Sequence, residues 1–320
     1  MHKFLKLFSL YIVFLFSNLF GVTIEIKDFF GTQSFDTPVK KVIISGTYLE
    51  LPAVLGIWDK VVGLDEYAFR IDVNQINNPY LENIYKINSA TLGNIEKILQ
   101  LSPDIIISST RSVQNINFGK KFGLKYLSFQ TYRITEVKEQ LSIMASLFGK
   151  TQKIKITIGE MDKIFKIIAQ QTKNIQKKKR VIFMFHKPNV ISGKESIVGD
   201  MLRYAATENI GEKYIEYDRA EVSIETIVNE NPDIIFIWWL SPYSVDDILH
   251  IPALKSVNAI KNKQVYKMPS FDGTGPRVAL MSLFVAKTAY SDYFKNTDID
   301  HILQNFYLNV FGFYPKDYRF

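Results

Sequence analysis

The chain has 320 residues, 47% of them hydrophobic and 22% charged, so it is globular rather than disordered and long enough for two domains. Its net charge of +7 is dispersed, without the clustered, aromatic-flanked Arg and Lys of a nucleic-acid-binding protein. The absence of cysteine excludes disulfides, thiolate metal sites, cysteine nucleophiles and a lipid-modified N-terminal cysteine.

Residues 1–21 have the features of a secretory signal peptide. Positive charges at Lys3 and Lys6 precede an apolar run from Leu7 to Phe20, and Gly21 is a small residue suited to cleavage. The run is shorter than the roughly 20 residues that span a bilayer. An uncleaved N-terminal anchor is the alternative. In either case we expect the folded part outside the cytoplasm, in the periplasm, where NAD-, ATP- or coenzyme A-dependent chemistry is not expected.

Signals for strands and helices alternate through residues 22–150. Strands are expected over 23–28, 42–45, 60–64 and 124–129, with a short helix over 49–55 that Gly56 ends. This alternation is typical of a doubly wound, mainly parallel sheet. We therefore predict an N-terminal α/β lobe over residues 22–150.

One stretch of this lobe occurs again later in the chain. Residues 94–107, NIEKILQLSPDIII, return at 223–236 as SIETIVNENPDIIF, with seven of the fourteen positions identical. Each copy predicts a short helix, a break at Pro-Asp and a buried strand, which together form half of a parallel crossover. Two copies indicate two lobes that are built alike.

A long helix is predicted between the two copies. Residues 135–180 contain no proline and no strand signal, and a break is expected at Gly149. From Ile154 to Ile168 apolar residues recur at intervals of four, three, four and three, which is a heptad-like stripe. A coiled-coil dimer is the competing explanation, but it usually needs more heptads. We interpret residues 151–176 as a rigid helix that connects the first lobe to a C-terminal α/β lobe over 177–320.

Strand and helix signals resume in the C-terminal part of the chain. A strand over 181–185 ends at His186, and a late strand over 264–268 opens into a glycine-rich loop, residues 269–277. A final helix is expected over about 278–290. The loop lacks the Gly-Lys-Ser/Thr ending of a phosphate-binding P-loop, so it does not indicate a nucleotide.

In order and spacing these elements resemble the periplasmic binding proteins of iron–siderophore, haem and cobalamin ABC importers. The resemblance rests on Ile24 to Gly31, Tyr48 to Gly56, the two repeat copies and Gly275-Pro-Arg277, and it covers about residues 23–295. It implies two Rossmann-like lobes joined by one long helix, a binding protein rather than an enzyme, and no resident cofactor.

The resemblance also implies a membrane partner. In the family one glutamate per lobe docks onto arginines of the permease, and the matching positions here are Glu96 and Glu225. A pair of solvated glutamates, favoured by the dipoles of the helices that they begin, is the alternative. We expect a monomer that hands its ligand to a permease dimer in the inner membrane.

The ligand is expected beyond the carboxyl ends of the strands, where open α/β sheets bind their ligands. Arginines there suit anionic oxygens, and tyrosine and tryptophan suit flat surfaces. The predicted ligand-binding residues are Tyr48, Tyr67, Arg70, Arg111, His186, Trp239, Tyr243 and Arg277, with Tyr132 and Asp272 in the same loops. Because no paired-histidine motif exists, a metal is expected to arrive already chelated, with His186 at most completing its coordination.

These residues leave several functions open. An iron–siderophore is the first candidate cargo, with haem, cobalamin, a nickel chelate or a molybdate-type oxyanion as alternatives. A chelatase-like enzyme of the same architecture is another, although the chain lacks a Gly-x-Ser-x-Gly nucleophile turn. A structural or adhesive surface protein is disfavoured because the repeat has only two copies. A stiff connecting helix predicts a modest hinge closure rather than a wide clamshell motion.

Overall fold

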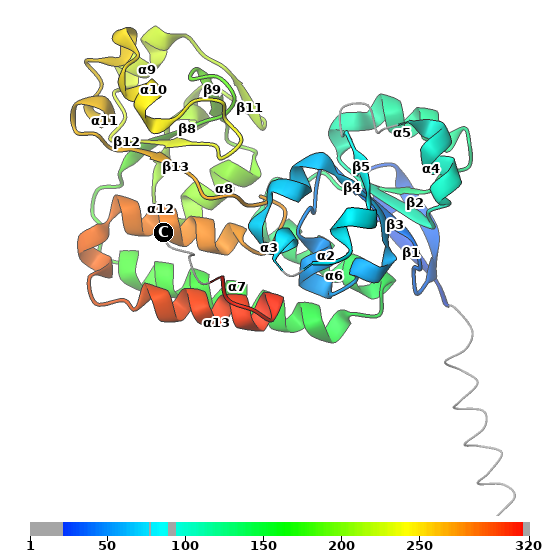
Figure 1. The fold of residues 1–320 in the computed structure, drawn as a ribbon. Coiled ribbons are helices and arrows are strands. Elements are labelled where there is room, and N and C mark those ends of the chain that lie inside the picture. The colour runs from blue at the N-terminus through cyan, green and yellow to red at the C-terminus, as the bar shows by residue number, and fades with distance from the viewer. Residues whose placement is uncertain (1–21, 77, 89–93, 316–320) are drawn as a thin grey trace, which may run out of the picture.

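A computed structural model describes residues 22–76, 78–88 and 94–315, so the predicted signal peptide lies outside the described residues. Figure 1 shows two α/β lobes side by side, with a layer of long helices beneath them. No helix in these described ranges is long and apolar enough to cross a membrane. The two-lobed α/β class predicted from the sequence is confirmed.

The N-terminal lobe contains a five-stranded parallel sheet and an antiparallel hairpin. Its strands are Val22–Asp28 (β1), Gly31–Thr37 (β2), Val42–Ser45 (β3), Val61–Asp65 (β4), Tyr85–Ile87 (β5), Ile105–Ser108 (β6) and Tyr126–Leu127 (β7). The sheet order is β5-β4-β3-β6-β7, and β1 pairs with β2. Strands β3 and β6 are buried at every position, as expected where helices cover both faces. The strand predicted at 124–129 is only two residues long, since it is an edge strand with one neighbour.

The C-terminal lobe contains a mixed sheet of six strands. They are Arg180–Met184 (β8), Val190–Ser192 (β9), Glu208–Asn209 (β10), Arg219–Glu221 (β11), Ile234–Ile237 (β12) and Val265–Lys267 (β13). The order is β11-β9-β8-β12-β13, and β10 also pairs with β8. Strands β8, β12 and β13 are parallel, whereas β9 is antiparallel to β8 and to β11. The lobes therefore share a parallel centre and differ at the edge that carries β11.

The helices cover both sheets and form the layer beneath them. They are Leu51–Leu55 (α2), Asp72–Gln75 (α3), Ile95–Leu101 (α4), Val113–Lys120 (α5), Ile134–Leu147 (α6), Thr151–Thr172 (α7), Ile197–Tyr204 (α8), Ile224–Glu230 (α9), Val245–Leu249 (α10), Asn258–Lys261 (α11), Val278–Ala289 (α12) and Ile299–Phe311 (α13). The expected break before the long helix is present, because Gly149 adopts a left-handed φ of 66° between α6 and α7.

The two repeat copies have the same geometry. Each helix has a side-chain N-cap, Asn94 for α4 and Ser223 for α9, and each ends at a residue with a positive φ. In both copies the Pro-Asp carboxylate anchors the start of the neighbouring strand. Asp104 accepts the backbone N–H of Lys41 at 2.9 Å, and Asp233 accepts that of Arg180 at 2.9 Å. The aspartate of each Pro-Asp therefore links the turn after the repeat helix to the start of the neighbouring strand.

Helix α7 connects the lobes, and it ends at Thr172 rather than at residue 176. Its 22 residues span about 33 Å at 1.5 Å per residue. The residues from Gln170 to Asn174 are polar, and the hydroxyl of Thr172 donates to the carbonyl of Ile168. The apolar stripe therefore stops there, and the basic residues 177–180 lie beyond the helix.

The connection between the lobes is a packed core rather than a bare helix. One apolar cluster contains Ile44 of β3, Met161 of α7 and Phe183 of β8, and smaller clusters cover the outer face of each sheet. Helices α6, α12 and α13 all contact α7, as the lower layer of Figure 1 shows. Side chains packed at interior density resist deformation, so this core stiffens the joint between the lobes.

Helix α13 is absent from the elements predicted above. Its buried residues Leu303, Phe306, Tyr307 and Val310 have ordinary helical spacing, so the signal was in the sequence. The helix crosses back beneath the first lobe and contacts α7 and α2. Helix α13 therefore joins the connecting helix to the first lobe.

Candidate functional site

A cavity of about 490 Å³ lies between the lobes at the carboxyl ends of the parallel strands. The first lobe contributes the segments after β3, β4, β6 and β7, and the second contributes those after β8, β12 and β13 together with the start of β11. Its polar and aromatic lining includes Thr47, Tyr67, Arg111, Tyr132, Phe185, Asp218, Arg219, Trp238, Trp239, Asp272 and Thr274. This is the place where the topology of an open α/β sheet predicts a ligand.

Three of the eight predicted ligand-binding residues line the cavity: Tyr67, Arg111 and Trp239. Tyr132 and Asp272 line it as well. Neighbouring residues on a strand point to opposite faces, but β12 ends at Ile237, before the tryptophan pair, so this alternation does not separate the two rings. Trp238 and Trp239 are both half-buried and both line the cavity.

Three other predicted residues lie off the cavity lining. Arg70 is exposed, and its guanidinium lies over the ring of Tyr67 at 5.5 Å from the centroid. His186 is exposed beyond β8, and Tyr243 is half-buried beyond β12. Each follows a strand in the chain, but none of the three belongs to the lining of the cavity. A coordinating role for His186 is therefore not supported by its position.

Tyr48 and Arg277 need a correction, because both are enclosed in the protein. Tyr48 is 1% exposed, its hydroxyl donates to Gln140, and burial raises the pKa of this phenol. Arg277 is fully buried, with ion pairs of 2.9 Å to Glu50 and 2.6 Å to Asp72. Neither is placed to contact a ligand. Both instead join segments that are far apart in the chain.

Arg277 belongs to a buried ionic contact between the lobes. Glu50 precedes α2 of the first lobe, and Arg277 precedes α12. The carboxylate of Glu50 also accepts the backbone N–H of Asp272 at 2.9 Å. Burial raises the pKa of Glu50 to about 7, although the neighbouring Arg277 charge opposes the shift. A Cβ on Gly275 would lie 2.6 Å from Glu50 Oε2, so only glycine fits there.

The glycine-rich loop before α12 uses its backbone N–H groups within the protein. Asp272 accepts the backbone N–H of Thr274 at 3.0 Å and that of Leu49 in the first lobe. Burial raises the pKa of Asp272, and these hydrogen bonds oppose the shift. The loop is thus a connection between the lobes.

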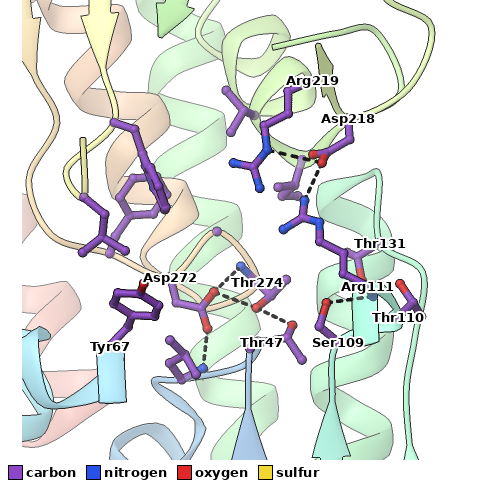
Figure 2. A pocket seen from close by; sticks show the side chains of 18 of the residues that line it. Thr47, Tyr67, Ser109, Thr110, Arg111, Thr131, Asp218, Arg219, Asp272 and Thr274 are labelled. Carbon is purple, nitrogen blue, oxygen red and sulfur yellow. Dashed lines mark hydrogen bonds and ion pairs between the residues drawn. The ribbon is translucent and has the colours of Figure 1, made fainter. Parts of the chain in front are cut away.

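The open side of the cavity carries another ionic contact between the lobes, shown in Figure 2. Oδ2 of Asp218 lies 2.6 Å from Nη2 of Arg111 and 3.6 Å from Nε of Arg219. Side-chain exposure is 62% for Arg111 and 38% for Asp218. Beside this contact the rings of Tyr132 and Tyr217 face each other across the lobes, with centroids 6.1 Å apart.

Arg219 is one of the cavity residues that the sequence analysis did not identify. Its guanidinium stacks over Phe185 at 4.3 Å and lies 5.7 Å from the ring centroid of Trp238. Burial, and secondarily the Arg111 charge, lowers the pKa of Arg219. The rule that finds residues after parallel strands does not reach it, because it begins β11, an antiparallel edge strand.

A metal site of protein ligands alone does not occur in the part of the chain that the structure describes. No group of three or more His, Asp or Glu side chains there is arranged to hold an ion. The cavity lining contains no histidine. A site of two arginines and several aromatic rings suits an anionic ligand, or a metal that arrives inside an anionic chelate.

The two glutamates predicted to dock a permease occupy equivalent positions. Glu96 lies in the first turn of α4, and Glu225 lies in the first turn of α9, one in each lobe. Both are exposed. For Glu225, hydrogen bonds from its own backbone N–H and from Ser223 lower the pKa, so this carboxylate is charged at neutral pH.

Comparisons with known proteins agree with this geometry. Residues 42–271 match the family described as periplasmic binding protein. The crystal structure of Helicobacter pylori CeuE in a Ni-His complex has 38% identity and a TM-score of 0.86, and covers 91% of this chain and 96% of that one. The molybdate-binding protein MolA of Haemophilus influenzae is 22% identical over 88% of this chain and 87% of its own length. The iron(3+)-hydroxamate-binding protein FhuD of Bacillus subtilis is 27% identical over 72% and 74%.

Proposed function

The chain belongs to the periplasmic binding protein family, as the solute-binding component of an ABC importer of the CeuE, FhuD and MolA class, and from that premise we propose its cargo. The cargo is a small metal chelate whose ligands carry anionic oxygens. The observation that carries this proposal is the pair Arg111 and Arg219, which bring one guanidinium from each lobe to a cavity rich in aromatic rings. Guanidinium groups bind carboxylates and other oxyanions in well-defined geometry.

The size of the cavity supports a chelate rather than a bare oxyanion. A volume of about 490 Å³ lies in the range of pockets that enclose small organic ligands. A metal with two or three small chelating ligands is of this size. A tetrahedral oxyanion would leave most of the cavity unfilled. The nickel complex bound by CeuE and the ferric hydroxamate bound by FhuD belong to the favoured class.

The lining of the cavity does not support the chelatase alternative. A chelatase needs a group that takes up protons or passes the metal to the tetrapyrrole, and histidine commonly fills that role. No histidine lines the cavity, and its two most buried carboxylates, Asp65 and Asp272, accept backbone N–H groups. The CeuE, FhuD and MolA relatives are binding proteins, in agreement with a binding role.

Tryptophan fluorescence tests the cargo directly. Two of the three tryptophans, Trp238 and Trp239, line the cavity, so a bound chelate is expected to quench emission. The mature protein would be titrated with Ni(II)–L-histidine, a ferric hydroxamate, a ferric catecholate, haemin and molybdate. Saturable quenching by one or more metal chelates, without a response to molybdate, is the expected result. A response to molybdate alone would overturn the proposal in favour of an oxyanion.

We also propose that Glu96 and Glu225 dock the protein onto arginines of its permease. Their exposure and their equivalent places in the two lobes support this role, since a permease dimer offers two equivalent sites. Reversing both charges (Glu96→Arg and Glu225→Arg) should abolish uptake in cells and leave the affinity for cargo unchanged. Reversal of the exposed Glu82 and Glu216 is the matched control. Loss of cargo binding in the first double variant would count against docking.

The location and the assembly state follow from the same role. The leader predicted at residues 1–21 directs the protein to the periplasm as a soluble monomer without a lipid anchor, since the chain contains no cysteine. Mass spectrometry of the exported protein tests both points. A mass that includes the leader would indicate an uncleaved anchor, and a native mass of two chains would exclude the monomer.

A further inference from the structure

Asp218 places a negative charge where an anionic ligand is expected to bind. Its Oδ2 atom is 2.6 Å from Arg111 in the first lobe and 3.6 Å from Arg219 in the second. Figure 2 shows the carboxylate between the two guanidinium groups. One oxygen thus contacts a cation from each lobe. An oxygen of a ligand carboxylate has the same charge and the same preferred partners.

The other acidic residues of the cavity do not compete in this way. Asp65 is fully buried, and its two carboxylate oxygens accept the backbone N–H groups of Gly46 and Tyr67. The carboxylate of Asp272 accepts backbone N–H groups of Thr274 and Leu49. Of the acidic residues that line the cavity, Asp218 is the one whose carboxylate faces both arginines.

The side chain of Asp218 can leave this position without a change in its backbone. Its backbone carbonyl accepts the N–H of Gly193 at 2.7 Å, and its N–H donates to the carbonyl of Glu195 at 2.8 Å. These bonds hold the residue at a φ of 42°, a conformation that aspartate tolerates better than most residues. The pair with Arg111 is solvent-exposed, and exposed ion pairs are weak.

We propose, on the basis of the function proposed above, that Asp218 is a specificity-determining residue that occupies the anion position until a ligand oxygen replaces it. In the ligand-free protein the carboxylate holds Arg111 and Arg219 and links the two lobes at the open side of the cavity. A chelate with a free or partly free carboxylate takes over both arginines, and the side chain of Asp218 rotates away. A chelate without such an oxygen leaves Asp218 in place and binds in a smaller, less cationic space.

Binding titrations of one variant and its control test the competition. Asp218→Asn keeps the shape of the side chain and removes its charge, and Glu216→Gln changes the net charge equally at an exposed position off the cavity lining. The probes are Ni(II)–L-histidine and Ni(II)–histamine, which lacks the carboxylate. Asp218→Asn should bind the histidine chelate about 2- to 5-fold tighter at low salt, as expected for loss of an exposed ionic competitor. The histamine chelate should gain nothing, and Glu216→Gln should match the wild type.

Weaker binding of the histidine chelate by Asp218→Asn, or a gain equal to that of Glu216→Gln, would overturn the proposal. A wild-type protein that binds no carboxylate chelate would overturn the proposed cargo instead.

A second experiment, without any ligand, tests whether Asp218 links the two lobes. Because the chain has no cysteine, Asn117→Cys on α5 and Asn229→Cys on α9 give two clean sites for spin labels. Asp218→Asn should lengthen or broaden the distance between the labels. A distribution identical to that of the wild type would show that Asp218 does not hold the lobes together.

Discussion

Two of the arginine–carboxylate contacts between the lobes differ in their access to water. In the buried contact, Arg277 and Glu50 are both 0% exposed. In the open contact, Arg111 is 62% and Asp218 38% exposed. Removing one member of a buried pair leaves an unpaired charge in a medium of low dielectric constant, whereas water solvates the remaining member of an exposed pair. The buried pair Arg277–Glu50 is therefore expected to stay formed, whereas a ligand can replace the exposed pair Arg111–Asp218.

The largest expected effect follows from breaking the buried contact. Arg277→Met should lower the free energy of unfolding by about 3–5 kcal/mol, because Glu50 keeps its burial and loses its cation. Urea denaturation of the mature protein measures this change. The double variant Arg277→Met/Glu50→Gln should recover part of the loss, since the uncompensated carboxylate is gone. A loss below about 1 kcal/mol in the single variant would contradict this prediction, because it would equal the small effect expected of an exposed ion pair.

The buried contact should also make stability depend on pH. The pKa of Glu50 rises from 4.5 to about 7 on folding, so between these values the folded state holds more protons than the unfolded chain. The contribution of Glu50 to the free energy of unfolding should therefore be largest below pH 4.5. It should decrease as the pH rises from 4.5 towards 7, by at most about 1.4 kcal/mol per pH unit. Urea midpoints from pH 4.5 to 8 measure the slope. Subtraction of the Glu50→Gln profile isolates the contribution of this carboxyl from that of the histidines, and equal profiles would contradict the shift.

The open contact should control binding rather than folding. Arg111→Gln and Arg219→Gln should each weaken binding of the cargo by about 10- to 100-fold, the range for loss of a charge-assisted hydrogen bond. Isothermal titration calorimetry with the chelate identified by tryptophan quenching measures the affinity. Lys255→Gln, an exposed charge in the second lobe, is the control. Unchanged affinity in both arginine variants would mean that the ligand binds elsewhere.

The smallest expected effect is the stability change at the open contact. Arg111→Gln should alter the free energy of unfolding by less than about 1 kcal/mol, because its partner is exposed and stays hydrated. The same urea titration that is used for Arg277→Met provides the comparison. A loss as large as that of the buried variant would remove the distinction between the two contacts.

The predictions that were confirmed rest on local patterns. The repeat copies contain their own caps and Pro-Asp breaks, so α4–β6 and α9–β12 could be located within a residue or two. The heptad-like stripe located α7 in the same way. These patterns predict structure because the periodicity of a helix or a strand depends only on residues a few positions apart in the chain.

The predicted site residues that the structure keeps out of the cavity lining differ from the others in the burial and position of loop side chains. Tyr48, Arg277 and Arg111 all follow or flank strands in the same manner, but only Arg111 of these three lines the cavity. Arg219 was missed because it begins an antiparallel strand at the one edge where the two sheets differ. Strand order and edge are set by pairing between distant segments, which a single sequence does not display.

The sequence by itself determined the fold class, the doubled α/β design, the long connecting helix and the exposed helix-start glutamates, because each depends on residues close together in the chain. The tertiary structure alone decided which arginine is a buried joint and which is open to a ligand. The partners of Arg277 and Arg111 lie 227 and 107 residues away, at Glu50 and Asp218. Burial and pairing at such separations depend on how the two lobes come together, and those two quantities determine what an arginine can do.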